Sequence, residues 1–236
     1  MTTIIATIIM THLTLICVTL YLHRCQAHRG IVLHPLVSHL MRFWLWLTTG
    51  MRTQEWVAIH RKHHGHTDRE GDPHSPMIYG IWRVLFGGAF LYTDAAKDKN
   101  MVDTWGRGAP NDWIELNLYS AHPSLGICVL FLLDCILFGW WGVLVWAVQM
   151  VNVPFLAAGV INGLAHWWGY RNGNTSCNSH NIVPWGIIIV GEELHHNHHL
   201  DTANPCFRVK WWEIDLGWVY FKILERLGLA YLRQLT

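Results

Sequence analysis

The sequence is short of charge. Only 14% of its 236 residues are Asp, Glu, Lys or Arg, whereas soluble domains carry roughly 25%. The net charge of +1 excludes the basic footprint of a nucleic-acid-binding protein. The six cysteines form no Cys-x-x-Cys pair, so we predict reduced thiols and no disulfide framework. What is abundant is apolar: 52% of the residues are hydrophobic and 15 are Trp, a composition that favours a membrane.

Three stretches are apolar over a length that can cross about 30 Å of hydrocarbon. We predict membrane spans at about 4–22, 116–139 and 140–161, the last two joined as a tight hairpin. The first stretch lacks the basic leader and the small-residue cleavage site of a signal peptide. The chain is therefore expected to be an integral membrane protein.

Lys and Arg predict the orientation of these spans. None occurs before Arg24, and none lies between 108 and 170. By the positive-inside rule, 23–115 and 162–236 are cytoplasmic. We thus expect one all-α domain over residues 1–236, a bundle of about three spans with a cytoplasmic helical cap.

Shorter apolar segments are expected to build the cap. The stretches 36–50 and 78–92 carry Arg or His among apolar residues, which is typical of helices that lie at the membrane surface. The tail 210–232 is predicted to be an amphipathic helix. The polar, turn-rich stretch 94–112 is predicted to be a surface loop.

Seventeen histidines equal Lys and Arg in number, and their grouping is informative. Four groups of His, one of them joined by an Asn, fall on the predicted cytoplasmic side. They are His23 and His28 in HRCQAH; His60, His63 and His64 in HRKHH; Asn162 and His166 in NGLAH; and His195, His198 and His199 in HHNHH. Because all four groups lie on one side of the membrane, they can meet at one site.

The spacing within the groups supports this convergence. Positions i, i+3 and i+4 lie on one helix face, which places His60, His63 and His64 together. The group from His195 to His199 repeats that pattern, and 162 and 166 are four apart. His23 and His28 are the exception, since five residues put them roughly 140° apart on a regular α-helix. They can share a metal only if the helix opens or turns there.

Nine His and one Asn exceed the four ligands of a structural zinc site and suit two metals. Neutral imidazole suits iron, copper, zinc and nickel, so ligand type leaves the metal open. A soluble carboxylate di-iron bundle would need Glu-x-x-His on two helices; among the ligand candidates only Glu192 with His195 has that spacing, which disfavours it. Packing or surface roles are expected for His12, His34, His39, His66, His74, His122 and His180, and His196 is left out because it breaks the ligand face.

The motifs HRCQAH, AIHRKHHGHTDREGDPHSP, NGLAHWWGY and GEELHHNHH resemble the histidine boxes of the membrane fatty acid desaturase family, close to its bacterial delta-9 forms. The resemblance covers nearly the whole chain. It implies a di-iron (Fe²⁺/Fe³⁺) enzyme that uses dioxygen to desaturate a saturated acyl chain, commonly between carbons 9 and 10. One iron would be bound by His23, His28, His60, His64 and His198, and the other by His63, His166, His195 and His199, with Asn162 acting through a water.

The resemblance implies further features. The acyl substrate would arrive on coenzyme A, on carrier protein or in a lipid. Electrons would come from a separate carrier, such as ferredoxin, rubredoxin or a b-type cytochrome. The protein would sit in a bacterial inner membrane with its site on the cytoplasmic side. The family usually has a transmembrane hairpin before the first box, whereas one span precedes His23 here, so a first helix is expected to be missing.

Three alternatives stay open at this stage. A hydroxylase of the same superfamily would share the first hydrogen abstraction. A metal transporter would place ionisable ligands inside the spans, and a shortened desaturase would be inactive. No catalytic side chain beyond the metal centre is predicted. Substrate-binding residues are not assigned, although Trp56, Trp82, Trp167 and Trp168 are candidates for the walls of an acyl tunnel, with packing the simpler role for each.

Overall fold

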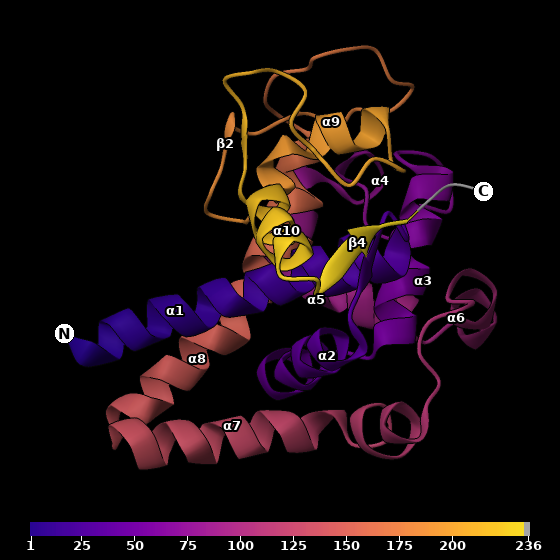
Figure 1. Ribbon diagram of the computed structural model, residues 1–236. Helices are drawn as coiled ribbons and strands as arrows, with labels where there is room; N and C mark the ends of the chain where they lie inside the picture. Colours follow the sequence, from indigo (N-terminus) through magenta and orange to yellow (C-terminus); the bar gives the residue numbers. More distant parts are fainter. Residues whose placement is uncertain (234–236) are drawn as a thin grey trace.

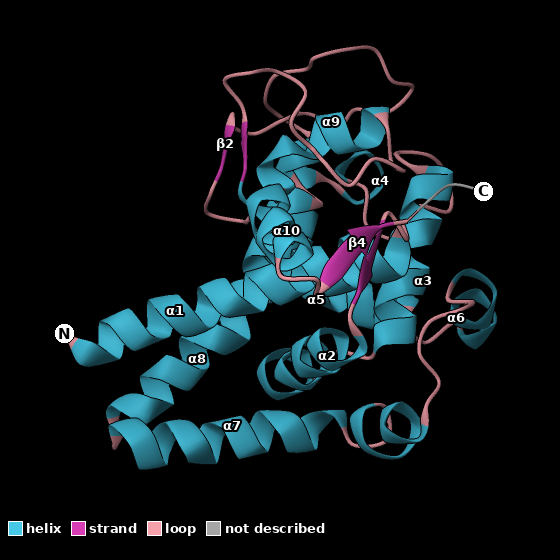
Figure 2. Cartoon of the chain, viewed as in Figure 1, coloured by secondary structure: helices cyan, strands magenta, loops and turns pink. Residues whose placement is uncertain are grey.

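The computed structural model describes residues 1–233, which are mainly helical (Figure 1, Figure 2). The α-helices are α1 (Thr2–Cys17), α2 (Pro35–Thr49), α3 (Thr53–His66), α4 (Pro76–Tyr79), α5 (Ile81–Ala95), α6 (Lys99–Trp105), α7 (Pro123–Phe138), α8 (Trp141–Val153), α9 (His195–Leu200) and α10 (Leu216–Arg226). Three π-helical segments are η1 (Val18–Ala27), η2 (Glu115–Tyr119) and η3 (Pro154–Ile161), and two 3₁₀ turns are η4 (Leu164–His166) and η5 (Glu192–Leu194). Short strands β1 (Ile31–Leu33) and β4 (Ala230–Leu232) pair antiparallel, and β2 (Trp185–Gly186) and β3 (Ile214–Asp215) pair parallel.

Two continuous helices are long and apolar enough to cross a membrane. They are Thr2–Ala27, formed by α1 and η1, and Trp141–His166, formed by α8, η3 and η4. Both agree with predicted spans, the first extending beyond 4–22 by a few residues at each end. In Figure 1 they lie side by side, and Asn152 of α8 donates a hydrogen bond to the Thr11 carbonyl of α1 (3.2 Å).

The middle predicted span, 116–139, is divided. The helix α7 begins only at Pro123 and has 16 residues, about 24 Å, which is short for the hydrocarbon core. Pro123 explains the break, because proline disfavours helical backbone at the residue before it, and His122 has φ −130° and ψ 59°. Residues 115–119 form the separate segment η2.

The predicted hairpin between α7 and α8 is present. Gly139 turns the chain with φ 59°, a conformation that glycine adopts at little cost. A Cβ at Gly142 would collide with the backbone of Asp134, so the two helices touch closely beside the turn. Trp140 and Trp141 are exposed at the tip, where aromatic rings suit a membrane interface.

The cap differs from the predictions in two places. Helices α2 and α5 agree with the two predicted surface helices, but the stretch 94–112 contains the helix α6 and is not a plain loop. The tail is helical only over α10, which ends before Gly228 (φ 72°). Residues 230–232 then pair with β1, about 200 positions away in the chain, so a long tail helix over 210–232 was wrong.

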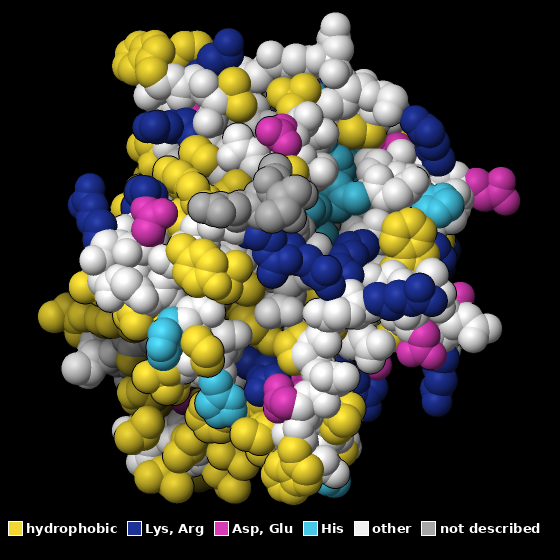
Figure 3. Space-filling model, turned by 45° about the vertical axis from the view of Figure 1, so that its right-hand side comes forward, with side chains coloured by type: hydrophobic (Ala, Val, Ile, Leu, Met, Phe, Trp, Pro, Cys, Tyr) yellow, Lys and Arg dark blue, Asp and Glu magenta, His cyan; other side chains and the backbone are white. Residues whose placement is uncertain are grey.

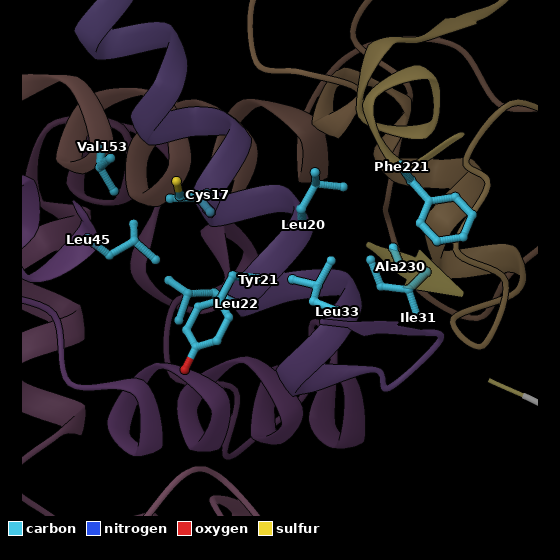
Figure 4. Packing of buried hydrophobic residues seen from close by; sticks show 11 residues of the cluster. Cys17, Leu20, Tyr21, Leu22, Ile31, Leu33, Leu45, Val153, Phe221 and Ala230 are labelled. Atoms are coloured by element: carbon cyan, nitrogen blue, oxygen red, sulfur yellow. The ribbon is translucent and has the colours of Figure 1, made fainter. Parts of the chain in front are cut away.

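The largest buried cluster joins the first span to the cap (Figure 4). Cys17, Leu20, Tyr21 and Leu22 pack against Leu45 of α2, Val153 of α8 and Phe221 of α10. This core directly precedes the first histidine motif. It therefore fixes the C-terminal end of the first long apolar helix against three other helices.

Candidate metal centre

Nine buried or half-buried histidines form two clusters. The five-His cluster contains His23, His28, His60, His64 and His198, and the four-His cluster contains His63, His166, His195 and His199; within each cluster, one ligand-type nitrogen per residue lies within 4.8 Å of all the others. In the five-His cluster, Nε2 of His60 lies 2.7 Å from that of His28 and 3.1 Å from that of His64. In the four-His cluster, Nε2 of His195 lies 2.9 Å from that of His166 and 3.1 Å from that of His199. The structure thus gathers all nine predicted His and separates them into the two groups that the resemblance implied.

A π-helix explains how His23 and His28 meet. In η1 the N–H of His28 donates to the carbonyl of His23 (3.0 Å), a bond across five residues instead of four. This wider turn brings positions five apart to the same side. The condition that the sequence set for a shared metal, a helix that opens or turns at this motif, is met by η1. Arg24, between the two His, points elsewhere and forms a buried ion pair with Asp215 (2.8 Å).

Three carboxylates orient three of the imidazoles. Nδ1 of His23 donates to Glu192 (2.8 Å), Nδ1 of His63 to Asp72 (2.9 Å), and Nδ1 of His166 to Asp68 (3.1 Å). A carboxylate can only accept here, so in each neutral ring the proton sits on Nδ1 and Nε2 carries a free lone pair. Partners of this kind fix ring orientation at metal sites.

Sequence reasoning missed these carboxylates as part of the site. Asp68 and Asp72 lie in the stretch HTDREGDPH, directly after the second histidine motif, and Glu192 precedes the last one. Burial alone would raise the pKa of Asp68, but hydrogen bonds from His166, Ser75 and the Asn178 N–H hold it below its usual value. The carboxylate of Asp68 is therefore ionised at neutral pH and accepts from His166.

The imidazoles outside the spans are held neutral. Burial, together with neighbouring imidazoles, lowers the pKa of His60, His63, His64, His195, His198 and His199 well below the usual value. A neutral ring is the form that binds a metal. Nε2 of His63 is buried and has no hydrogen-bond partner, so its lone pair is free for a cation.

The spacing of the nitrogens fits two metal ions. Two nitrogens bound at about 2.1 Å lie about 3.0 Å apart when they subtend a right angle and about 3.4 Å apart in a tetrahedron. The Nε2 pairs are separated by 2.7 to 3.1 Å. This spacing favours five- or six-coordinate ions over a tetrahedral structural zinc.

An apolar cavity of about 380 Å³ reaches both clusters, a size within the range of ligand pockets. His23 and His60 of one cluster and His195 of the other line it, together with Asn162. Its other walls come from the spans and the cap, including Val18, Trp56, Ile59, Tyr92, Met150, Val153, Ala157 and Ile161. The site therefore combines two nitrogen-rich clusters with a space shaped by hydrocarbon side chains.

Of the four predicted tunnel Trp residues, only Trp56 lines this cavity. Its ring stacks on His60 with centroids 4.8 Å apart. Trp82, Trp167 and Trp168 are instead more than half exposed. The sequence around these Trp residues does not distinguish a cavity wall from an exposed surface.

The other His residues are not members of the two clusters, but one of them touches the site. His196 points away from them and bonds Ser179 and the Gly173 carbonyl, and His12 bonds Tyr220. His74, predicted to be a packing residue, is buried, stacks on His63 at 4.4 Å and lines the cavity. It is the one residue of the set-aside group that touches the site.

The sequence profile described as "Fatty acid desaturase" matches residues 1–233. The chain belongs to the fatty acid desaturase family. The resemblance of the histidine motifs is thereby confirmed, and the family's membrane-helical character agrees with the two long apolar helices.

Individual desaturases align over most of this chain. Delta-9 acyl-lipid desaturase 2 of Arabidopsis thaliana is 31% identical over 220 residues, covering 90% of this chain and 68% of that protein. Icosanoyl-CoA 5-desaturase of Limnanthes douglasii is 30% identical, covering 90% of this chain and 59% of that protein. The sn-1 stearoyl-lipid 9-desaturase of Anabaena variabilis is 27% identical, covering 90% and 76%. The chain thus spans less than two thirds of one of these desaturases and somewhat more of the other two.

Proposed function

We propose that this chain is an oxygen-dependent desaturase that introduces a double bond, of delta-9 type, into a saturated fatty acyl chain. One observation carries the proposal: the free Nε2 lone pairs of two histidine clusters converge beside one apolar cavity. The cavity suits a hydrocarbon chain, and the clusters suit two metals.

The metals would be iron. His23, His28, His60, His64 and His198 would bind one ion, and His63, His166, His195 and His199 the other, with Asn162 of the cavity wall acting through a water. When bound, two irons supply the redox chemistry that lets dioxygen remove hydrogen from an unactivated methylene. The number of nitrogens and their near-right-angle spacing favour an ion with five or six ligands over a tetrahedral structural zinc, and the choice of iron follows the family.

The chain's own residues would bind, orient and exclude water. Asp68, Asp72 and Glu192 hold three ligand rings in the tautomer that exposes Nε2. The apolar walls hold the acyl chain, and the position of a methylene relative to the clusters sets where the double bond forms. No acid–base side chain is required for breaking a C–H bond, in keeping with a catalytic centre that consists of the metals alone.

The acyl carrier of the substrate and the source of electrons are proposed from the family relationship. The printed names of the relatives include acyl-lipid and acyl-CoA enzymes, so we propose a lipid- or CoA-linked acyl chain, carrier protein being the third candidate. Electrons would come from a separate protein such as ferredoxin, rubredoxin or a b-type cytochrome. We place the enzyme in a bacterial inner membrane with three spans, the single domain's clusters facing the cytoplasm.

The test is lipid analysis after expression in a host without a desaturase of its own. Wild type is expected to contain iron and to yield acyl chains lighter by two hydrogens, whereas His63→Ala yields none. A gain of one oxygen would instead identify a hydroxylase. Equal unsaturation in wild type and His63→Ala would refute the proposed metal centre.

A further inference from the structure

Part of the cap carries apolar side chains that no other part of the described chain covers. We call this surface the C-terminal apolar face: Trp185, Ile187, Ile188, Ile214, Val219 and Ile223. It is continuous across β2, β3 and α10, because Trp185 pairs with Ile214 in the parallel ladder and α10 follows β3 directly. All six side chains are more than two fifths exposed, and Ile188 reaches 69%. On a soluble protein, an exposed apolar patch of this kind would mark an interaction surface.

The elements that bear this face pack against the middle of the first long helix, Thr2–Ala27. Ile189 and Val190, which follow Ile188, pack on Leu15 of α1. The hydroxyl of Tyr220 in α10 lies 2.8 Å from Nε2 of His12. Leu15 and His12 precede the ligand His23 by eight and eleven residues, about 12 to 17 Å along the helix. The C-terminal apolar face therefore lies beside membrane-spanning residues and not above them.

The second long helix flanks the same region. Ile189 and Val190 share one buried cluster with Ile161 of η3, and Leu156 and Val160 pack against it. In Figure 1 the loop after β2 descends toward α1, and α10 lies directly over that helix. The buried residues next to the face therefore pack against both long apolar helices.

Positively charged side chains border the face: on α10 the exposed Arg226 lies one turn after Ile223. The exposed Trp211 follows Lys210, and Lys222 of α10 lies over the Trp218 ring at 5.7 Å. Trp and Lys together are typical of the boundary between hydrocarbon and headgroups. Elsewhere on the molecule, Figure 3 shows hydrophobic side chains gathered in the lower part and Lys and Arg mainly across the middle and upper parts.

We propose that the C-terminal apolar face is immersed in the hydrocarbon of the leaflet next to the metal centre, with phospholipid acyl chains as its partner. The cap then dips into the membrane, and the cavity at the clusters lies at the level of the lipid chains. This inference rests on the proposed membrane topology of the enzyme. It also explains His12, whose polar ring inside the span is bonded by a residue of the immersed helix.

The test uses the full chain in vesicles of equal parts phosphatidylcholine and phosphatidylglycerol. The photoreactive residue p-benzoylphenylalanine replaces Ile188, Ile223 or, as the control, the exposed Ser176 of the 171–180 loop. After irradiation, phospholipid adducts are quantified by mass spectrometry. We expect about tenfold more adduct at 188 and 223 than at 176, because the excited benzophenone reacts with neighbouring C–H bonds, which are dense in the hydrocarbon core and absent from water.

Two results would overturn the proposal. One is an equal lipid yield at all three positions, and the other is a dominant adduct between two copies of the chain at 188. Adduct formation requires neither iron nor turnover. Failure of the desaturase proposal therefore shows in the lipid analysis and leaves this measurement unaffected.

Discussion

The two histidine clusters draw on the same two helices in opposite ways. Helix α3 gives its i, i+4 pair, His60 and His64, to the five-His cluster and its intermediate His63 to the four-His cluster. Helix α9 gives its i, i+4 pair to the four-His cluster and its intermediate His198 to the five-His cluster. Each helix therefore contributes to both clusters, so a displacement of either helix disturbs the whole centre.

The clusters differ in how their rings are supported. One ring of the five-His cluster bonds a carboxylate, Glu192, whereas two rings of the four-His cluster do, through Asp68 and Asp72. The smaller cluster thus has fewer nitrogens and more negative charge behind them. We expect the four-His cluster to depend more on its carboxylates, and the five-His cluster on the number of its ligands.

Removing one ligand from each cluster should have the largest effect. His198→Ala and His195→Ala each leave about one iron per chain, because the other cluster keeps its full set, and each lowers desaturation by at least about 100-fold. Iron per chain and lipid unsaturation are the measurements. His66→Ala is the matched control, since His66 lies on α3 but bonds only the Glu70 carbonyl. Two irons retained in His195→Ala would contradict the assignment of that cluster.

Neutralising the carboxylates should have a smaller effect on metal binding, and the effect should differ between the two clusters. Asp68→Asn and Asp72→Asn are expected to weaken metal retention by the four-His cluster about 10- to 100-fold, and Glu192→Gln that of the five-His cluster. The amide no longer attracts the Nδ1 proton as the charged group does. Iron retention against increasing chelator is the measurement, with Glu70→Gln as the control, because Glu70 is exposed and lies between Asp68 and Asp72. Wild-type retention in Asp68→Asn would show that His166 needs no carboxylate.

The comparison also shows what could be predicted from the sequence. Six of the nine His were identifiable because each of the two HxxHH motifs places three rings on one helix face, whatever the surrounding fold. The closeness of His23 and His28 was not, since it requires the π-helix η1, and nothing local to HRCQAH specifies a bond across five residues. The carboxylates were missed for another reason: Asp68 reaches His166 across 98 positions, a contact that exists only in the folded chain.

The same distinction holds for the fold. Hydropathy predicted the two long spans and the hairpin, because these depend on local composition and on Gly139. Pro123 marks the break before α7, but the apolar residues on both sides of it favour one continuous span. The pairing of β1 with β4 could not be predicted, since both are three residues long and about 200 positions apart.

The smallest predicted effect concerns one stacked ring beside each cluster. Trp56 stacks on His60 of the five-His cluster, and His74 on His63 of the four-His cluster; both line the cavity. Trp56→Leu and His74→Leu are expected to lower desaturation about 2- to 10-fold, the worth of one aromatic contact, with two irons retained. Trp56→Phe and His74→Phe keep a ring and should recover most of that loss. Loss of iron from His74→Leu would instead make His74 part of the four-His cluster. If neither Phe variant recovers activity, the shape of the side chain, and not stacking, matters at the cavity wall.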